Sequence, residues 1–223
     1  MTEGLVFPLW RAAAGPAWGA YTRHAFVRGL GDGSLPRAAF LHYLVQDYLF
    51  LVHFARAWAL GVTKADTIDE MRACAATTRA LIDDEMRLHV GICAEAGITE
   101  AQLAAAEEHV GNLAYTRYVL DAGHAGDFAD LLAALAPCVM GYGEIGARLA
   151  AEAGDTPYRA WIDTYAGADY QAVCGEVAGL IDGAVARRRG ADPVDHPRWP
   201  GLCWRFTTAT RLEVGFWDLG LAP

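Results

Sequence analysis

Apolar residues recur at helical spacing along almost the whole chain, and this pattern is its strongest structural constraint. No pair of alternating segments is joined by a tight Gly-Asn or Asn-Gly turn of the kind that is typical of β-hairpins. The sequence therefore predicts an all-α fold.

Glycine, proline and capping residues divide the chain into expected helices. The first clear helix follows Trp18 and ends in the glycine cluster 29–33, with Ser34 as the N-cap of the next helix. That next helix runs from Pro36 toward Gly61 and is apolar on more than one face, which indicates a central position. Further helices are expected at 66–97, after the capping box Thr99–Gln102, around Cys138, and at 157–166, 170–189 and 202–219, with breaks at 111–112, 123–127, 154–155 and 190–200.

The chain length and the breaks favour one domain. With 223 residues and 54% hydrophobic content, the chain has enough apolar side chains for a single core. Only the proline-rich segment 190–200 is long enough to be a linker, and the single helix after it is not expected to fold alone. We expect residues 1–223 to form one domain of roughly eight or nine helices.

Charge and cysteine usage exclude several classes of protein. The chain has 18 basic and 27 acidic residues, a net charge of −9, which argues against nucleic acid as a partner. The arginine run 187–189 ends a predicted helix, where a structural role is expected. Five scattered cysteines predict neither a disulfide framework nor a zinc site. Without a signal peptide or a membrane-spanning stretch, we expect a cytoplasmic protein that does not bind membranes.

Three polar groups interrupt otherwise apolar helices. Cys138 and Tyr142 are four residues apart, so helical geometry places them on one face. Asp47 and Glu213 lie in two other apolar segments. Each of these residues alone fits a structural role, as core filler or as a hydrogen-bonded buried acid. Together, a thiol, a phenol and carboxylates are the parts of a nucleophile with acid/base partners, in a pocket between helices.

A metal site is the weaker interpretation. Glu85 and His89 are expected on one helical face. Di-iron sites in helical bundles require paired Glu-x-x-His elements with further carboxylates, and no second such pair occurs. We therefore expect no metal.

Several motifs in order then resemble a known family. They are Gly31-Asp-Gly33-Ser-Leu35-Pro36, Tyr43-Leu-Val-Gln46-Asp47-Tyr48, Pro137-Cys138 with Gly141-Tyr142, Tyr158-x-x-Trp161-Ile-Asp-x-Tyr165, and Glu213-x-x-Phe216-Trp217-Asp218. Together they span nearly the whole chain and resemble the TenA family of thiaminase II-like enzymes. The resemblance implies a single haem-oxygenase-like helical bundle without haem or another cofactor, commonly a homotetramer, with a role in thiamin salvage.

The cysteine at this position is similar to that of aminopyrimidine aminohydrolases. These enzymes convert 4-amino-5-aminomethyl-2-methylpyrimidine to the 5-hydroxymethyl compound and also cleave thiamin. By resemblance, Cys138 is the nucleophile and Glu213 the acid/base. Tyr142 and Tyr165 are expected to assist both through hydrogen bonds.

The resemblance also implies the substrate contacts. Asp47 is expected to hold the aminopyrimidine edge, and Tyr115 and Phe216 to wall the ring. At Phe50 many relatives have a tyrosine, so here the ring face is kept and the hydroxyl is lost. This change leaves open a pyrimidine-binding or regulatory protein with little turnover, and a metal-dependent oxygenase on the same scaffold is the other alternative.

Overall fold

The computed structural model describes residues 3–222, and this part of the chain contains helices and no strands. The prediction of an all-α fold is confirmed. The helices are α1 (Val6–Ala14), α2 (Pro16–Thr22), α3 (Ala25–Asp32), α4 (Arg37–Lys64), α5 (Ile68–Ala80), η1 (Leu81–Glu85, π-helical), α6 (Met86–Glu95), α7 (Glu100–Ala104), α8 (Val110–Ala125), α9 (Phe128–Glu152), α10 (Arg159–Ala166), α11 (Ala168–Arg189), η2 (Pro193–Asp195, 3₁₀) and α12 (Trp199–Leu221).

The N-terminal region differs from its prediction, because α2 and α3 replace the one expected helix and α1 precedes them. Gly15 breaks the first from the second with a φ of 53°, a value that glycine adopts without steric cost. The side chain of His24 caps the third helix by accepting from the backbone N–H of Phe26. Gly33 then ends α3 in the left-handed region, so the predicted glycine stop is confirmed.

One predicted helix cap and one predicted break are wrong. The N-cap of α4 is Pro36 in extended conformation, whereas Ser34 belongs to the preceding turn and donates its N–H to Asp32. The expected break at 111–112 lies inside α8, which His109 caps. There Asn112 is buried and donates from Nδ2 to the carbonyl of Gln46 on α4, so a tertiary hydrogen bond holds a residue that usually favours turns. The capping box at Thr99 is confirmed.

The predicted helix 66–97 contains a π-helical turn. Thr67 caps α5, and the backbone changes to π-helical at η1 before α6 continues. Such turns are rare and occur frequently at functional sites. Here the turn carries Asp84 and Glu85.

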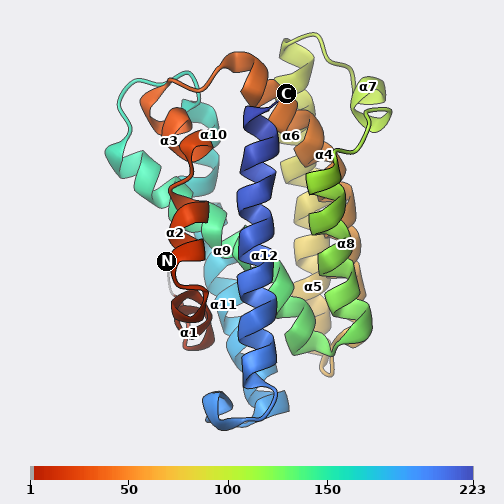
Figure 1. Ribbon diagram of the computed structural model, residues 1–223. Coiled ribbons are helices and arrows are strands. Elements are labelled where there is room, and N and C mark those ends of the chain that lie inside the picture. The colour runs from red at the N-terminus through yellow and green to blue at the C-terminus, as the bar shows by residue number, and fades with distance from the viewer. Residues whose placement is uncertain (1–2, 223) are drawn as a thin grey trace.

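The long helices α4, α9, α11 and α12 form the body of the molecule. Figure 1 shows α12 running through its middle, with α4, α5 and α8 on one side and α1, α2, α3 and α10 on the other. The buried side chains form one cluster with many aromatic rings, which is where a bundle can place a ligand site.

Helix α9 is the most deeply buried helix of this body. By length and composition it is long and apolar enough to cross a bilayer, contrary to the expectation that no such stretch exists. In the structure 89% of its most apolar window is buried inside the protein. Its composition therefore reflects packing against α8, α10, α11 and α12.

The arginine run 187–189 at the end of α11 forms ion pairs, as its predicted structural role requires. Its partners are Glu70 on α5 and Asp127 at the start of α9. Arg198 and Arg205 reach the same end of α9 through Asp130. These partly buried pairs tie α5, α9, α11 and α12 together below the core.

A close approach between α9 and α10 depends on one glycine. A Cβ atom placed on Gly146 would lie 2.5 Å from the backbone carbonyl carbon of Tyr165 and 2.7 Å from its Cβ. Rigid backbone cannot yield as a flexible side chain would. Gly146 therefore fixes how closely α10 brings Tyr165 to α9.

We predict that Gly146→Ala lowers the free energy of unfolding by about 1–3 kcal/mol, because an overpacked contact forces the two helices apart. Gly179→Ala on the exposed face of α11 is the matched control, since nothing lies within 4 Å of its added Cβ. The control is expected to gain about 0.5–1 kcal/mol from helix propensity. Urea unfolding measures the free energy of unfolding of both variants. The same change in Gly146→Ala and Gly179→Ala would contradict the packing argument.

Candidate active site

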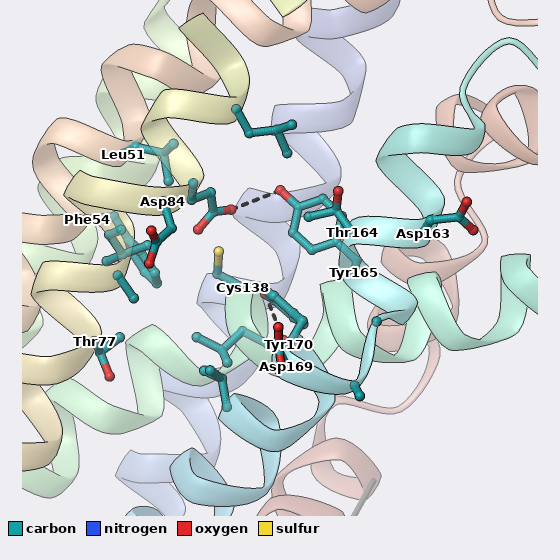
Figure 2. Close-up of a pocket in the computed structure, with 18 residues that line it drawn as sticks. Leu51, Phe54, Thr77, Asp84, Cys138, Asp163, Thr164, Tyr165, Asp169 and Tyr170 are labelled. Carbon is teal, nitrogen blue, oxygen red and sulfur yellow. Dashed lines mark hydrogen bonds between the residues drawn. The ribbon is translucent and has the colours of Figure 1, made fainter. Parts of the chain in front are cut away.

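A cavity of about 520 Å³ opens between α4, α5, η1, α9, α10 and α11. Figure 2 shows the sulfur of Cys138 pointing into it, with Phe54 and Asp84 on one side and Tyr165 on the other. The volume is in the range of pockets that bury a small organic ligand. Apolar side chains such as Leu51 make up most of the wall.

Cys138 owes its position to a weakened turn of α9. It follows Pro137, which has no N–H to donate to the carbonyl four residues earlier. The side chain of Cys138 lies on the wall and is 9% exposed. The thiol is thus largely buried and yet accessible from the cavity.

Glu213 lies behind the thiol, on α12. Its Oε1 atom accepts a hydrogen bond of 2.7 Å from the hydroxyl of Tyr115, and the carboxyl group is 1% exposed. Burial raises the pKa of Glu213 to about 8, while hydrogen bonds with Tyr115, Tyr21 and Cys138 act in the opposite direction. Glu213 therefore exchanges a proton near neutral pH, as an acid/base group must.

Asp47 forms a second buried group on α4. Its Oδ2 accepts from the hydroxyl of Tyr43 at 3.0 Å and lies 3.2 Å from Nε2 of His89, outside hydrogen-bond geometry. Burial lowers the pKa of His89 to about 4 and raises that of Asp47 well above its usual value. Both shifts favour a neutral imidazole beside a protonated carboxyl group.

Glu85 supplies a third carboxyl group, from the π-helical turn η1. It lines the cavity and accepts a 2.9 Å hydrogen bond from the hydroxyl of Tyr165, drawn as a dashed line in Figure 2. Burial raises its pKa to about 7, and the hydrogen bond with Tyr165 opposes this shift. Of the three carboxyl groups Asp47, Glu85 and Glu213, Glu85 is the one that lines the cavity.

Burial and the nearby carboxyl groups determine the state of the thiol. Burial raises the pKa of Cys138 well above its usual value, and the acidic groups Glu213, Glu85 and Asp47 raise it further. In the resting protein Cys138 is therefore a thiol. A thiolate forms only when its proton moves to a nearby base and the new charge is compensated.

The comparisons with known proteins show the family of the chain. Residues 11–221 match the family described as TENA/THI-4/PQQC. The chain belongs to this family. An aminopyrimidine aminohydrolase of Halalkalibacterium halodurans is 34% identical over 92% of this chain and 91% of its own, and one of Helicobacter pylori is 31% identical over 91% and 92%.

A crystal structure supports the TenA fold closely. The protein, described as a TenA family transcription regulator from Silicibacter sp., is 60% identical, with a TM-score of 0.98 over 100% of this chain and 99% of that one. A TenA homologue of P. horikoshii has a TM-score of 0.87 at 26% identity, over 98% and 99%. The haem-oxygenase-like helical fold expected from the sequence is confirmed.

The structure places the residues expected from TenA relatives in two layers. Cys138 and Tyr165 lie on the cavity wall. The hydroxyl of Tyr165 donates to Glu85, and the hydroxyl of Tyr142 lies 3.4 Å from that of Tyr43. Tyr142 is therefore linked to Asp47 through Tyr43, although it shares a helix with the cysteine.

The expected ring-walling residues form a cluster behind the wall. The ring of Phe50 lies 5.1 Å from that of Tyr115 and 5.3 Å from that of Phe216. All three side chains are buried. They pack beside Glu213, since Tyr115 both stacks in this cluster and donates to that carboxyl group.

Sequence reasoning missed the role of Glu85 in the wall and considered it only as a metal ligand. The described residues hold no group of three or more His, Cys, Asp and Glu side chains arranged for a metal ion. Two tyrosines were also missed: Tyr170 lines the cavity, and Tyr21 packs over Gly141 and donates to the carbonyl of Pro137. The spacing of Leu81, Asp84, Glu85 and Leu88 was the available signal, because it places them on one helical face.

We predict that the Glu213→Gln variant loses less stability than the wild type as the pH rises. Between the ordinary pKa of 4.5 and about 8 the folded protein keeps a proton that the unfolded chain has released, so the free energy of unfolding falls with pH. Glutamine cannot lose this proton, so the variant lacks this decrease in the free energy of unfolding, which amounts to about 1.4 kcal/mol for each pH unit. Parallel stability curves from pH 5 to 7.5 would contradict the raised pKa.

Proposed function

We propose that the protein is an aminopyrimidine aminohydrolase of thiamin salvage, which converts 4-amino-5-aminomethyl-2-methylpyrimidine to the 5-hydroxymethyl compound and releases ammonia. The observation that carries this proposal is a cavity-facing Cys138 thiol with Glu213 next to it. Relatives with the aminohydrolase name cover most of the chain, which supports the same reaction.

The buried thiol and Glu213 suit a nucleophilic attack on the pyrimidine ring. The sulfur of Cys138 bonds to an electron-poor ring carbon while its proton moves to Glu213, and Glu213 delivers a proton to a ring nitrogen. A neutral thiol and a neutral ring thus become a neutral adduct. No charge is left unpaired in the apolar site, which removes the electrostatic cost of a free thiolate.

Departure of the amine completes the exchange. Electrons of the adduct form an exocyclic C=C bond as the C–N bond of the protonated amine breaks, and its electron pair leaves with the nitrogen as ammonia. Water then adds to the exocyclic methylene and its proton goes to a base. The C–S bond breaks, and the ring nitrogen returns its proton to the sulfur, which restores the aromatic ring. The sum is an amine replaced by a hydroxyl group, with Cys138 regenerated.

Asp47 is suited to recognise the aminopyrimidine edge. A protonated carboxyl group presents one donor and one acceptor, which complement a ring nitrogen and the adjacent amino group. The raised pKa of Asp47 and its hydrogen bond from Tyr43 support this state. A pyrimidine without the amino group would leave the carboxyl group unpaired and bind less well.

Phe50 is proposed to act through its ring alone. It packs at a tilt against Tyr115 and Phe216 behind the cavity wall, so it would support from behind the wall against which a pyrimidine binds. The missing hydroxyl removes one hydrogen bond that a tyrosine could give to a leaving group. We propose that thiamin is cleaved as a second substrate, at a rate that a Phe50→Tyr substitution would change.

A binding or regulatory protein with little turnover is the second candidate. The similar Silicibacter structure is described as a transcription regulator, which favours this alternative. The net charge of −9 argues against direct contact with DNA. A pyrimidine that binds without being hydrolysed would support it.

We also propose an oligomeric state and a cellular compartment for the protein. Large apolar side chains are exposed on separate faces, including Leu5 at 78%, Val110 at 71% and Trp204 at 60%. Burial between copies would remove them from water. We propose a cytoplasmic homotetramer, and light scattering is expected to give about four times the mass of the 24.0 kDa chain.

We predict that Cys138→Ser lowers ammonia release from the aminomethylpyrimidine by at least about a thousandfold, because a hydroxyl group is a far weaker nucleophile here. Cys203→Ser on α12 is the matched control, since Cys203 lies outside the cavity wall. The control is expected to keep wild-type activity. Full activity of folded Cys138→Ser would disprove the nucleophile assignment, and binding without turnover by the wild type would favour the regulatory candidate.

A further inference from the structure

The charge of the cavity wall is entirely acidic. The described residues that line the cavity include the carboxylates Asp84, Glu85, Asp163 and Asp169, and no lysine, arginine or histidine. Asp163 is paired with Arg159 at 2.9 Å, and Asp84 and Asp169 are exposed. Glu85 differs from these three because it lies deeper and its partner is a neutral hydroxyl group.

The position of Glu85 leaves it able to bind a ligand. The hydroxyl of Tyr165 donates a hydrogen bond to Oε1 of Glu85. This bond holds the carboxyl group on the wall of the cavity that Cys138 also lines. The ionisable groups that act on the site from neighbouring helices, namely Asp47, Cys138, Tyr165, Tyr170 and Glu213, are neutral or acidic. None of these groups carries a positive charge, so none of them would repel a cation in the cavity.

A substrate amine brings such a cation. An aliphatic amine is an ammonium ion in neutral water, and transfer into an apolar cavity would remove its proton unless a carboxylate accompanies it. We propose that Glu85 is the counter-ion that binds the ammonium group of the aminomethyl substituent and so selects the amine substrate over its hydroxymethyl product. This inference rests on the proposed function.

The contact also assists the departure of the amine. When the C–N bond of the ammonium form breaks, its electron pair leaves with the nitrogen and the product is neutral ammonia, so no further acid is required. The ammonia beside Glu85 can then accept the proton of the attacking water and leave as ammonium. Glu85 thus acts on the leaving group, whereas Glu213 serves the ring.

Binding measurements separate these roles. In the Cys138→Ser background, which prevents turnover, calorimetry at pH 8 compares the aminomethyl compound with the hydroxymethyl compound. Adding Glu85→Gln keeps the acceptor for Tyr165 and removes the charge. We expect the dissociation constant of the aminomethyl compound to rise roughly tenfold to hundredfold, from the strength of a charged hydrogen bond. That of the hydroxymethyl compound should change less than about threefold, which also reports that the variant is folded.

Asp84→Asn is the matched control for net charge, because Asp84 lies on the same turn and the same cavity. It is expected to change either dissociation constant less than about threefold. An equal loss for both compounds in Glu85→Gln, no loss for either, or the same loss in Asp84→Asn would overturn the role of Glu85 while the proposed function stands. Failure of both compounds to bind Cys138→Ser would overturn the proposed function and this inference together.

Discussion

The grouping of three carboxyl groups around one thiol, with Asp47 and Glu213 buried and Glu85 half-buried on the cavity wall, is the constraint on which this structure depends. Asp47, Glu85 and Glu213 come from separate helical segments, and each accepts a hydrogen bond from one tyrosine hydroxyl. A carboxyl group deprived of water is costly unless it is paired or protonated. Tyr115 on α8 and Tyr165 on α10 meet this requirement across helices, so moving either helix would remove a hydrogen bond from Glu213 or Glu85, whereas Tyr43 serves Asp47 within α4.

The same burial determines the chemistry. Because the surrounding acids disfavour a thiolate, Cys138 is a thiol in the resting protein, and in the proposed mechanism its proton reaches the substrate through Glu213. The resting site is thereby protected from nonspecific reaction, since the thiol rather than the thiolate is the dominant form. A ligand that carries positive charge relieves the crowding of acids. The electrostatics that suppress the free thiolate therefore favour a cationic aminopyrimidine.

Helical periodicity was sufficient to predict the all-α class, and the interruption of apolar helices by Cys138 and Glu213 predicted a thiol and an acid that lie next to each other. Asp47 lies instead with Tyr43 and His89, away from the cavity wall. Glu85 was considered only as a metal ligand beside His89, because its segment is mixed in composition and the sequence does not show that this acid faces a cavity. The breaks at Gly15 and the helical state of Asn112 were also missed, because a local φ angle and a distant hydrogen bond decide them. The single-domain organisation and the catalytic roles stay predictions.

The central claim is that these acids and the thiol converge on one pyrimidine ring. A crystal structure of Cys138→Ser with the aminomethylpyrimidine bound tests it most directly. The account predicts the ring beside residue 138 and Glu213, its amino edge on Asp47 and its ammonium group on Glu85. A ligand bound elsewhere, or an ammonium group turned away from Glu85 toward solvent, would contradict it.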